Sequence, residues 1–290
     1  MRIDRLYAAG RPVFSFEFFP PKTDDSARQL MRTAEDLREM LSPDFISVTY
    51  GAGGSTRGRT LELVSRIQED LGVTTMAHLT CVGHTRDEVA GVLDKLQSRG
   101  VENVLALRGD PPKGEESFRS VEGGFDHASE LAAFVRERGD FGIGGACYPE
   151  THPESPSPEE DLRWTLHKVR AGVGFLVTQL FFDNADYLHF VEQARAAGID
   201  VPIVPGIMPI TNVSQIERFT KMCGARIPAE LHDRLRRYQD DAPTVMAMGI
   251  EHAVRQCRGL LDAGAPGIHF YTLNKSHATR SILAAIKPLD

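Results

Sequence analysis

Residues 13–49 read VFSFEFFPPKTDDSARQLMRTAEDLREMLSPDFISVT, which predicts a strand, a helix and a second strand in succession. The runs Val13 to Phe18 and Phe45 to Thr49 are rich in aromatic and β-branched residues, as strands are. Between them, from Ser26 to Leu41, apolar residues recur at helical spacing. Two strands joined by a helix run parallel in a sheet, so this stretch predicts one βαβ unit.

The same alternation continues along the chain. Six further strand-like runs bring the total to eight: Thr75–Thr80, Asn103–Leu107, Gly144–Cys147, Phe175–Gln179, Pro202–Gly206 and Gly267–Tyr271. Helical spacing fills the intervals Arg59–Leu71, Arg86–Arg99, Ala128–Arg138, Pro158–Gly172 and Ala185–Ala197. Between the seventh and eighth strands lie extra helical segments, which we interpret as an insertion: Val213–Met222, Ala229–Tyr238 and Val245–Ala263.

Eight such units favour a single-domain (β/α)8 TIM barrel of the α/β class over residues 1–290. The alternative is an open, doubly wound sheet. It is disfavoured because no G-x-G-x-x-G motif follows a strand and there is no Walker A motif; the glycines of 51–54 (GAGG) and 142–145 (GIGG) have the wrong spacing.

Composition excludes several classes of protein. Forty-one per cent hydrophobic and 25% charged residues are typical of a folded chain and exclude intrinsic disorder. A net charge of −7 without a basic block argues against nucleic-acid binding, and no apolar run reaches the ~20 residues of a membrane helix. The four cysteines have neither disulfide nor zinc spacing. We expect a cytoplasmic protein with no membrane partner, no nucleic-acid partner and no metal.

In a barrel, chemistry lies at the carboxyl ends of the strands. Seven of the eight predicted ends carry polar or ionisable residues: Glu17, Thr49, His78 with Thr80, Arg108 with Asp110, Tyr148 with His152, Gln179, and Tyr271 followed by Asn274 and Lys275. Any one of them could be a hydrogen-bonded core residue. Their convergence favours an active site.

Glu17 is the sharpest candidate. It alternates with Phe16 and Phe18 and shares a strand face with Ser15, so its carboxylate should face the barrel interior. Burial is expected to raise the pKa of Glu17 above the ordinary ~4.3 and make it a proton donor near neutral pH. The alternative is an ion pair with Arg108 or Lys275.

Two loops at the predicted strand ends remain ambiguous from the residues alone. The glycines after Thr49 let backbone approach a ligand closely, but glycine is common in loops. Arg108 and Asp110 flank a glycine and form either a local salt bridge or a ligand contact. The residues thus predict an acid, hydrogen-bonding groups and a cationic rim, without a substrate.

Eight motifs resemble the methylenetetrahydrofolate reductase family, in order and at the family's spacing, from Phe14 to Lys275. They are SFEFFPPK (15–22), TYGA (49–52), AHLT (77–80), ALRGDPP (106–112), YPETHPE (148–154), TQLFF (178–182), PGIMP (205–209) and HFYTLNK (269–275). The chain is similar to the short bacterial type, which lacks a C-terminal regulatory domain.

This resemblance implies a (β/α)8 flavoprotein that reduces 5,10-methylenetetrahydrofolate to 5-methyltetrahydrofolate with NADH or NADPH and so supplies methionine synthesis. A bound carrier is needed because no amino-acid side chain donates hydride. In the family the carrier is FAD. Nicotinamide and folate use one face of the flavin in turn, which implies a ping-pong order.

The resemblance also implies roles for particular residues. Glu17 matches the acid that protonates folate N10, and Asp110 matches an aspartate near the flavin pyrimidine edge and the pterin. Gln179 matches a folate-binding glutamine, Phe219 matches an aromatic residue that stacks on folate or nicotinamide, and Lys275 takes the place of an arginine or lysine near the substrates. The positions matching FAD contacts are Thr49, His78, Leu107, Arg108, Gly109, Asp110, Ala128, Tyr148, His152, Asp161 and Lys168. His127, Trp164 and His167 differ from the residues common in the family, so the resemblance does not define the contacts to the adenine end of FAD.

Two other functions stay open: a flavin-independent reductase that passes hydride directly from nicotinamide to folate, and a non-catalytic folate-binding barrel. The retained acid argues against the second. The sequence does not choose between NADH and NADPH, nor give a polyglutamate preference. Because the family forms dimers and tetramers, we expect a homo-oligomer.

Overall fold

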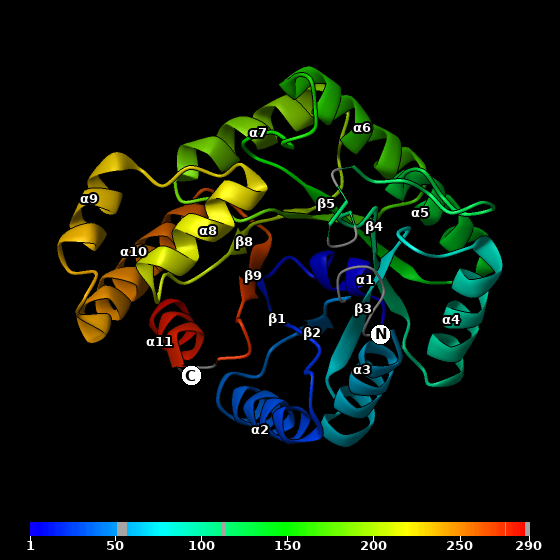
Figure 1. Ribbon diagram of the computed structural model, residues 1–290, viewed down its shortest axis with the longest axis horizontal. Helices are drawn as coiled ribbons and strands as arrows, with labels where there is room; N and C mark the ends of the chain where they lie inside the picture. Colours follow the sequence, from blue (N-terminus) through cyan, green and yellow to red (C-terminus); the bar gives the residue numbers. More distant parts are fainter. Residues whose placement is uncertain (51–56, 112–113, 116, 276, 288–290) are drawn as a thin grey trace.

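Figure 1 shows a computed structural model of the chain, which describes residues 1–50, 57–111, 114–115, 117–275 and 277–287. The strands are β1 (Val13–Phe18), β2 (Phe45–Val48), β3 (Thr74–Thr80), β4 (Asn103–Leu107), β5 (Gly142–Cys147), β6 (Phe175–Thr178), β7 (Ile203–Val204), β8 (Gly206–Ile207) and β9 (Gly267–Tyr271). The helices are α1 (Ile3–Tyr7), α2 (Asp24–Leu41), α3 (Arg57–Leu71), α4 (Arg86–Ser98), α5 (Ala128–Arg138), α6 (Pro158–Arg170), α7 (Asn184–Ala196), α8 (Val213–Cys223), α9 (Ala229–Arg237), α10 (Ala242–Asp262) and α11 (His277–Ile286).

The strands form one parallel sheet in the order β7-β6-β5-β4-β3-β2-β1-β9-β8. The first strand pairs with the last, β9, and the helices surround the strands (Figure 1). This confirms the TIM barrel, and the open doubly wound sheet is wrong, because such a sheet does not join its first strand to its last. The three helices α8 to α10 lie between β8 and β9, as the predicted insertion requires.

The predicted seventh strand is divided in two by Pro205. Its two parts, β7 and β8, pair with β6 and β9 respectively, so together they bridge the ends of the sheet. Proline has no amide hydrogen to donate to a ladder, but its carbonyl still accepts. The oxygen of Pro205 takes a 3.0 Å hydrogen bond from the His269 amide.

Strand register places polar and apolar side chains in separate layers inside the barrel. Ser15 and Glu17 of β1 lie beside Phe45 and Ser47 of β2, and beside His269 and Tyr271 of β9. Toward the amino-terminal ends of the strands, the interior is an apolar cluster that includes Phe45, Met76, Leu105, Phe175 and Val177. The opposite faces of the strands, with Phe14, Phe16 and Phe18 on β1, pack in the main core. Glu17 therefore faces inward, as predicted.

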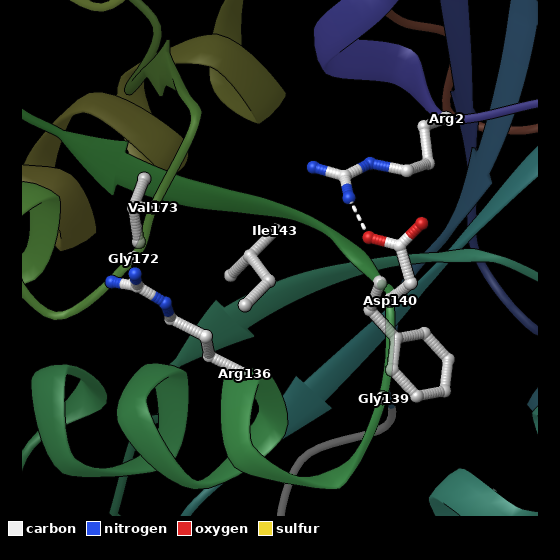
Figure 2. Close-up of a pocket in the computed structure, with 8 residues that line it drawn as sticks. Arg2, Arg136, Gly139, Asp140, Ile143, Gly172 and Val173 are labelled. Carbon is white, nitrogen blue, oxygen red and sulfur yellow. Dashed lines mark hydrogen bonds and ion pairs between the residues drawn. The ribbon is translucent and has the colours of Figure 1, made fainter.

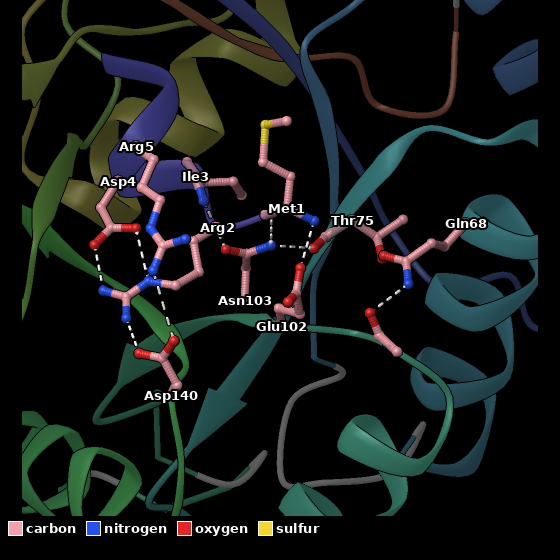
Figure 3. A network of polar contacts seen from close by, with 11 residues as sticks. Met1, Arg2, Ile3, Asp4, Arg5, Gln68, Thr75, Glu102, Asn103 and Asp140 are labelled. Carbon is pink, nitrogen blue, oxygen red and sulfur yellow. Dashed lines mark hydrogen bonds and ion pairs between the residues drawn. The ribbon is translucent and has the colours of Figure 1, made fainter. Parts of the chain in front are cut away.

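The amino-terminal end of the barrel is filled by a helix that the sequence patterns did not reveal. Ile3 and Tyr7 of α1 join the interior cluster, and the Tyr7 ring lies 5.5 Å from that of Phe175. The Asn103 amide accepts from the Ile3 N–H at 2.8 Å and donates to the carbonyls of Met1 and Thr75 (Figure 3). A five-residue helix is too short for a periodic signal.

A second cluster supports the insertion beside the barrel mouth. It joins Leu180 and Phe182, after β6, to Met208 and Ile210 and to the apolar side of α8. Helix α11 was also not predicted. Within the part of the chain that the structure describes, no helix has the length and apolarity needed to cross a membrane.

Candidate active site

Glu17 lies at the centre of a buried polar cluster at the carboxyl end of the barrel. Its Oε2 is 3.3 Å from Nε2 of His78 on β3 and 3.3 Å from Nε2 of His269 on β9. The His269 contact has hydrogen-bond geometry, whereas the His78 contact does not. The side chains of Glu17 and His78 are 8% and 6% exposed and that of His269 is fully buried.

The predicted upward pKa shift of Glu17 is wrong. Burial does act to raise the pKa, but the charge of His78 and the hydrogen bond and charge of His269 outweigh it and lower the pKa to about 2. The alternative prediction, an ion pair of Glu17 with Arg108 or Lys275, is also wrong, because among the described residues Glu17 forms no ion pair with either side chain. Glu17 therefore rests as a carboxylate held by two imidazoles.

A buried serine holds one of the two imidazoles in place. The Ser15 hydroxyl lies 2.7 Å from His269 Nδ1 and has this one partner among the described residues. Because an ionised carboxylate only accepts, the Nε2 of His269 carries the hydrogen that faces Glu17, while its Nδ1 shares a hydrogen bond with the Ser15 hydroxyl. Ser15 itself is fully buried, so it holds the imidazole and is not exposed to a ligand.

Arg108, after β4, is engaged by a carboxylate that sequence reasoning did not single out. Its two terminal nitrogens bond the two oxygens of Glu154 at 2.6 and 2.8 Å, and its guanidinium lies 5.1 Å from the Phe118 ring centre. The local Arg108–Asp110 salt bridge is therefore not formed. Asp110 is exposed at the mouth.

Tyr148, Gln179 and Asp110 meet across the ends of β5, β6 and β4. Burial raises the pKa of the Tyr148 hydroxyl, the charge of Asp110 adds to this, and a hydrogen bond with Gln179 opposes it. The backbone of Gln179 is tied to β5 by a 2.7 Å bond from its amide to the Cys147 carbonyl. Three predicted site residues from separate strands thus converge.

Three other predicted cofactor residues support the loop after β5. Asp161 of α6 is buried and accepts a 2.9 Å bond from the His152 amide, while the Tyr148 ring lies edge-on to that of His152 at 4.5 Å. The Lys168 ammonium donates to the Ala146 carbonyl, and burial lowers its pKa. Lys168 therefore places its charge against the end of β5.

The three residues that depart from the family pattern are joined by two ring contacts, one stacked and one tilted. The rings of His127 and Trp164 lie 4.3 Å apart at 25°, and those of Trp164 and His167 lie 5.3 Å apart. His127 also lines a cavity of about 430 Å³, together with Arg108, Phe118, Ser120, Asp126 and Glu154. This cavity lies over the loops that follow β4 and β5, at the carboxyl end of the barrel.

The remaining predicted residues lie around the same mouth. Thr49 follows β2 and Leu107 ends β4, and Ala128 begins α5. Gly109 has a φ of +88°, and a Cβ there would be 2.8 Å from Val82, so glycine fits both the backbone and the space. Phe219 is half-buried on α8 with Arg218 5.4 Å from its ring centre, and Lys275 is exposed after β9. The glycines of 51–54 and Pro112 lie outside the described residues.

The donors at this mouth fit a polar ring with a phosphate tail. Thr80 Oγ1 is buried without a hydrogen-bond partner among the described residues and so remains available to a ligand, whereas His78 Nε2 faces Glu17 Oε2 at 3.3 Å. The cavity over the loops after β4 and β5 is lined by Arg108, whose fork matches a phosphate and is bonded to Glu154 here, and by His127, which stacks on Trp164. In the described part of the chain, no group of three His, Cys, Asp or Glu residues is arranged to hold a metal ion.

A second cavity, of about 440 Å³, lies at the opposite end of the barrel. Figure 2 shows Arg2, Arg136 and Asp140 among its lining, with Gly139 and Gly172 from the loops that precede β5 and β6. The guanidinium of Arg2 is already paired with the carboxylates of Asp4 and Asp140. The described residues that line this cavity include none of the predicted site residues that converge at the carboxyl end.

Sequence reasoning missed His269 and Ser15 as parts of the acid cluster and Glu154 as the partner of Arg108. A signal existed for the first pair: both alternate inward with Glu17 and Tyr271 on strands that close the barrel. No local signal connects Glu154 to Arg108, since 46 positions separate them.

Comparisons with known proteins agree with this architecture. The family described as methylenetetrahydrofolate reductase matches residues 2–287. A protein named "Methylenetetrahydrofolate reductase (NADH) 1" from Arabidopsis thaliana is 42% identical over 300 residues, covering 100% of this chain and 50% of its own length. The chain spans about half the length of the plant relatives it matches.

A bacterial relative is covered almost completely. The Escherichia coli K12 "5,10-methylenetetrahydrofolate reductase" is 38% identical over 273 residues, covering 94% of this chain and 90% of its own. Among solved structures, an uncharacterized protein from Clostridium thermocellum, described as binding two copies of 5-methyl-5,6,7,8-tetrahydrofolic acid, superposes with a TM-score of 0.66. It covers 99% of this chain and 98% of its own at 14% identity, a likeness of fold. By profile and relatives together, the chain belongs to the methylenetetrahydrofolate reductase family.

Proposed function

We propose that this protein reduces 5,10-methylenetetrahydrofolate to 5-methyltetrahydrofolate, using NADH or NADPH through a bound FAD in a ping-pong order. The observation that carries the proposal is the buried Glu17 at the mouth of a barrel of this family, between two histidines. A carboxylate so placed is suited to handle a proton at a substrate atom in a dry site.

In this proposal Glu17 delivers the proton that folate N10 needs for the imidazolidine ring to open. Since the low pKa keeps Glu17 ionised in the ligand-free protein, its Oε2 takes up the proton from solvent water as the substrate binds. A bound ligand removes the remaining water from the mouth, and desolvation then favours the neutral acid. His269 keeps its Nε2–H toward Glu17 and so fixes the orientation of the carboxyl group.

The chain's other mouth residues hold the ligands. Arg108 and Lys168 would supply positive charge to hold a pyrophosphate, and Thr49, His78, Leu107, Gly109, Ala128, Tyr148, His152 and Asp161 would hold the rest of the FAD. Asp110 would tune the flavin by its negative charge, and Gln179, Phe219 and Lys275 would bind folate. The bound cofactor would supply hydride transfer between nicotinamide and folate, which no side chain can provide.

The biological setting follows from the activity. We propose a cytoplasmic homo-oligomer, dimer or tetramer, whose product feeds methionine synthesis.

The visible spectrum of the purified protein tests this function. We expect a flavin absorption band, with about one FAD per chain, that bleaches on anaerobic addition of NADH or NADPH and returns on addition of 5,10-methylenetetrahydrofolate. A colourless protein that still turns over folate would establish the flavin-independent reductase instead. A protein that binds folate but catalyses neither half-reaction would be the folate-binding barrel.

A further inference from the structure

Side chains reinforce the contact between the end of β1 and the end of β9, where the last backbone bond runs from the Thr272 amide to the Glu17 carbonyl at 3.3 Å. The parallel pairing stops at Glu17 and Tyr271. Beyond it, Thr272 donates from Oγ1 to the Glu17 carbonyl at 2.6 Å. Asn274 then accepts from the Phe19 amide at 2.8 Å and donates to the Phe19 carbonyl at 2.9 Å.

The asparagine amide acts here as a substitute peptide group. It carries the same donor and acceptor pair as a backbone amide, and it satisfies both polar backbone groups of Phe19. This is the last such opportunity before the loop turns, since Pro20 and Pro21 have no amide hydrogen. We call these two bonds between the Asn274 side chain and the Phe19 backbone the clamp. The clamp fixes the chain at the point where it leaves the barrel next to Glu17.

The backbone at the clamp is specific as well. Leu273 and Asn274 have φ angles of +52° and +60°, a region that asparagine tolerates better than most residues. The backbone N–H of Asn274 donates to Thr272 Oγ1 at 3.1 Å, and the backbone N–H of Lys275 donates to the Thr272 carbonyl at 2.9 Å. The same turn therefore also sets the position of Lys275.

The clamp holds an exposed aromatic ring next to the acid. Phe14, Phe16 and Phe18 pack in the core, whereas Phe19 is 39% exposed and continues the alternation of Ser15 and Glu17. An exposed phenylalanine on that face, at the carboxyl end of the barrel, is placed to contact a planar ligand.

We propose that Asn274 is a positioning residue that fixes Phe19 at the barrel mouth, where the ring forms an apolar wall against the planar ring system of bound folate. This rests on the proposed function for the identity of the ligand. Asn274 acts through Phe19 and does not itself touch the reacting atoms.

A double-mutant cycle tests this coupling. Asn274→Gly keeps the positive φ and removes the amide, and Phe19→Ala removes the ring. In the holoenzyme, each is expected to weaken equilibrium binding of 5-methyltetrahydrofolate by about 3- to 10-fold, the size of an aromatic contact. The double variant should bind no more weakly than Phe19→Ala alone. Additive losses would overturn the proposal.

Asn103→Ser is the matched control. Asn103 makes the same kind of clamp, accepting from one backbone amide and donating to backbone carbonyls, at the opposite end of the barrel. Its loss should lower the free energy of unfolding without changing the dissociation constant for folate. A folate defect equal to that of Asn274→Gly would reduce the clamp to a stabilising role.

Hydrogen exchange of the Phe19 amide tests the clamp without any ligand. It should be protected in the wild type and exchange faster in Asn274→Gly, and unchanged exchange would overturn the clamp. If the wild-type holoenzyme binds no folate while Asn274 still protects the Phe19 amide, the proposed function fails and the clamp stands.

Discussion

His269 Nε2 and Glu17 Oε2 lie 3.3 Å apart in the barrel interior, although 252 positions separate the two residues in the chain. The contact exists because β1 and β9 are neighbours in the closed sheet and both residues face inward. Together with His78, whose Nε2 lies 3.3 Å from the same oxygen, it reverses the expected effect of burial on the pKa of Glu17. The resting acid is a stabilised anion, and this has consequences that can be measured.

Glu17→Gln keeps the size of the side chain but cannot donate a proton. Reduction of the flavin by NAD(P)H should stay near the wild-type rate, while transfer to methylenetetrahydrofolate falls by ~10²- to 10⁴-fold. Anaerobic stopped-flow measurement of each half-reaction separates the two steps. Glu69→Gln, on the exposed surface of α3, is the control. Equal loss in both half-reactions would mean that Glu17 is structural.

The lowered pKa of Glu17 also predicts a pH dependence of stability. Its folded-state value, about 2, lies below the ordinary 4.5, so its ionisation stabilises the fold above pH 4.5. That contribution is lost as pH falls from 4.5 toward 2. Urea unfolding of the wild type and Glu17→Gln should therefore show a stability difference that shrinks across this window. A wild-type advantage that grows as pH falls from 7 would indicate a raised pKa.

Asp110 should tune the flavin and not donate protons. Its charge disfavours an anionic reduced flavin, so Asp110→Asn should raise the flavin midpoint potential. Flavin reduction should be intact or faster and oxidation by folate slower. Redox titration and stopped-flow kinetics check this, with Asp94→Asn on the exposed face of α4 as the control of equal charge change. An unchanged potential in a variant that retains FAD would remove Asp110 from this role.

Glu154 occupies the Arg108 fork that a pyrophosphate would use. Glu154→Gln should therefore tighten FAD binding to the apoprotein by about 2- to 5-fold, the size of a partly exposed ion pair, and Arg108→Ala should weaken it. Trp164, the one tryptophan of the chain, stacks on His127 beside this cavity, so quenching of its fluorescence reports the titration. If both variants weaken binding equally, Glu154 instead holds Arg108 in place for the cofactor.

Local sequence determined the elements and their order. The alternation in residues 13–49, repeated along the chain, predicts the parallel barrel, because strand and helix periodicities are properties of neighbouring residues. The same alternation places Glu17 and Ser15 inward, and the strand ends locate the mouth. Pro205 interrupts a strand that the apolar pattern alone made continuous.

Tertiary structure decided which charges meet. The histidines around Glu17 come from β3 and β9, and the carboxylate on Arg108 comes from the loop after β5. A pKa depends on distances of a few ångströms between such groups, and periodicity contains no information about distances between separate strands. The sequence by itself therefore determined the barrel and the face on which its acid lies, while the meeting of β1 with His78 of β3 and His269 of β9 decided that the acid rests as an anion.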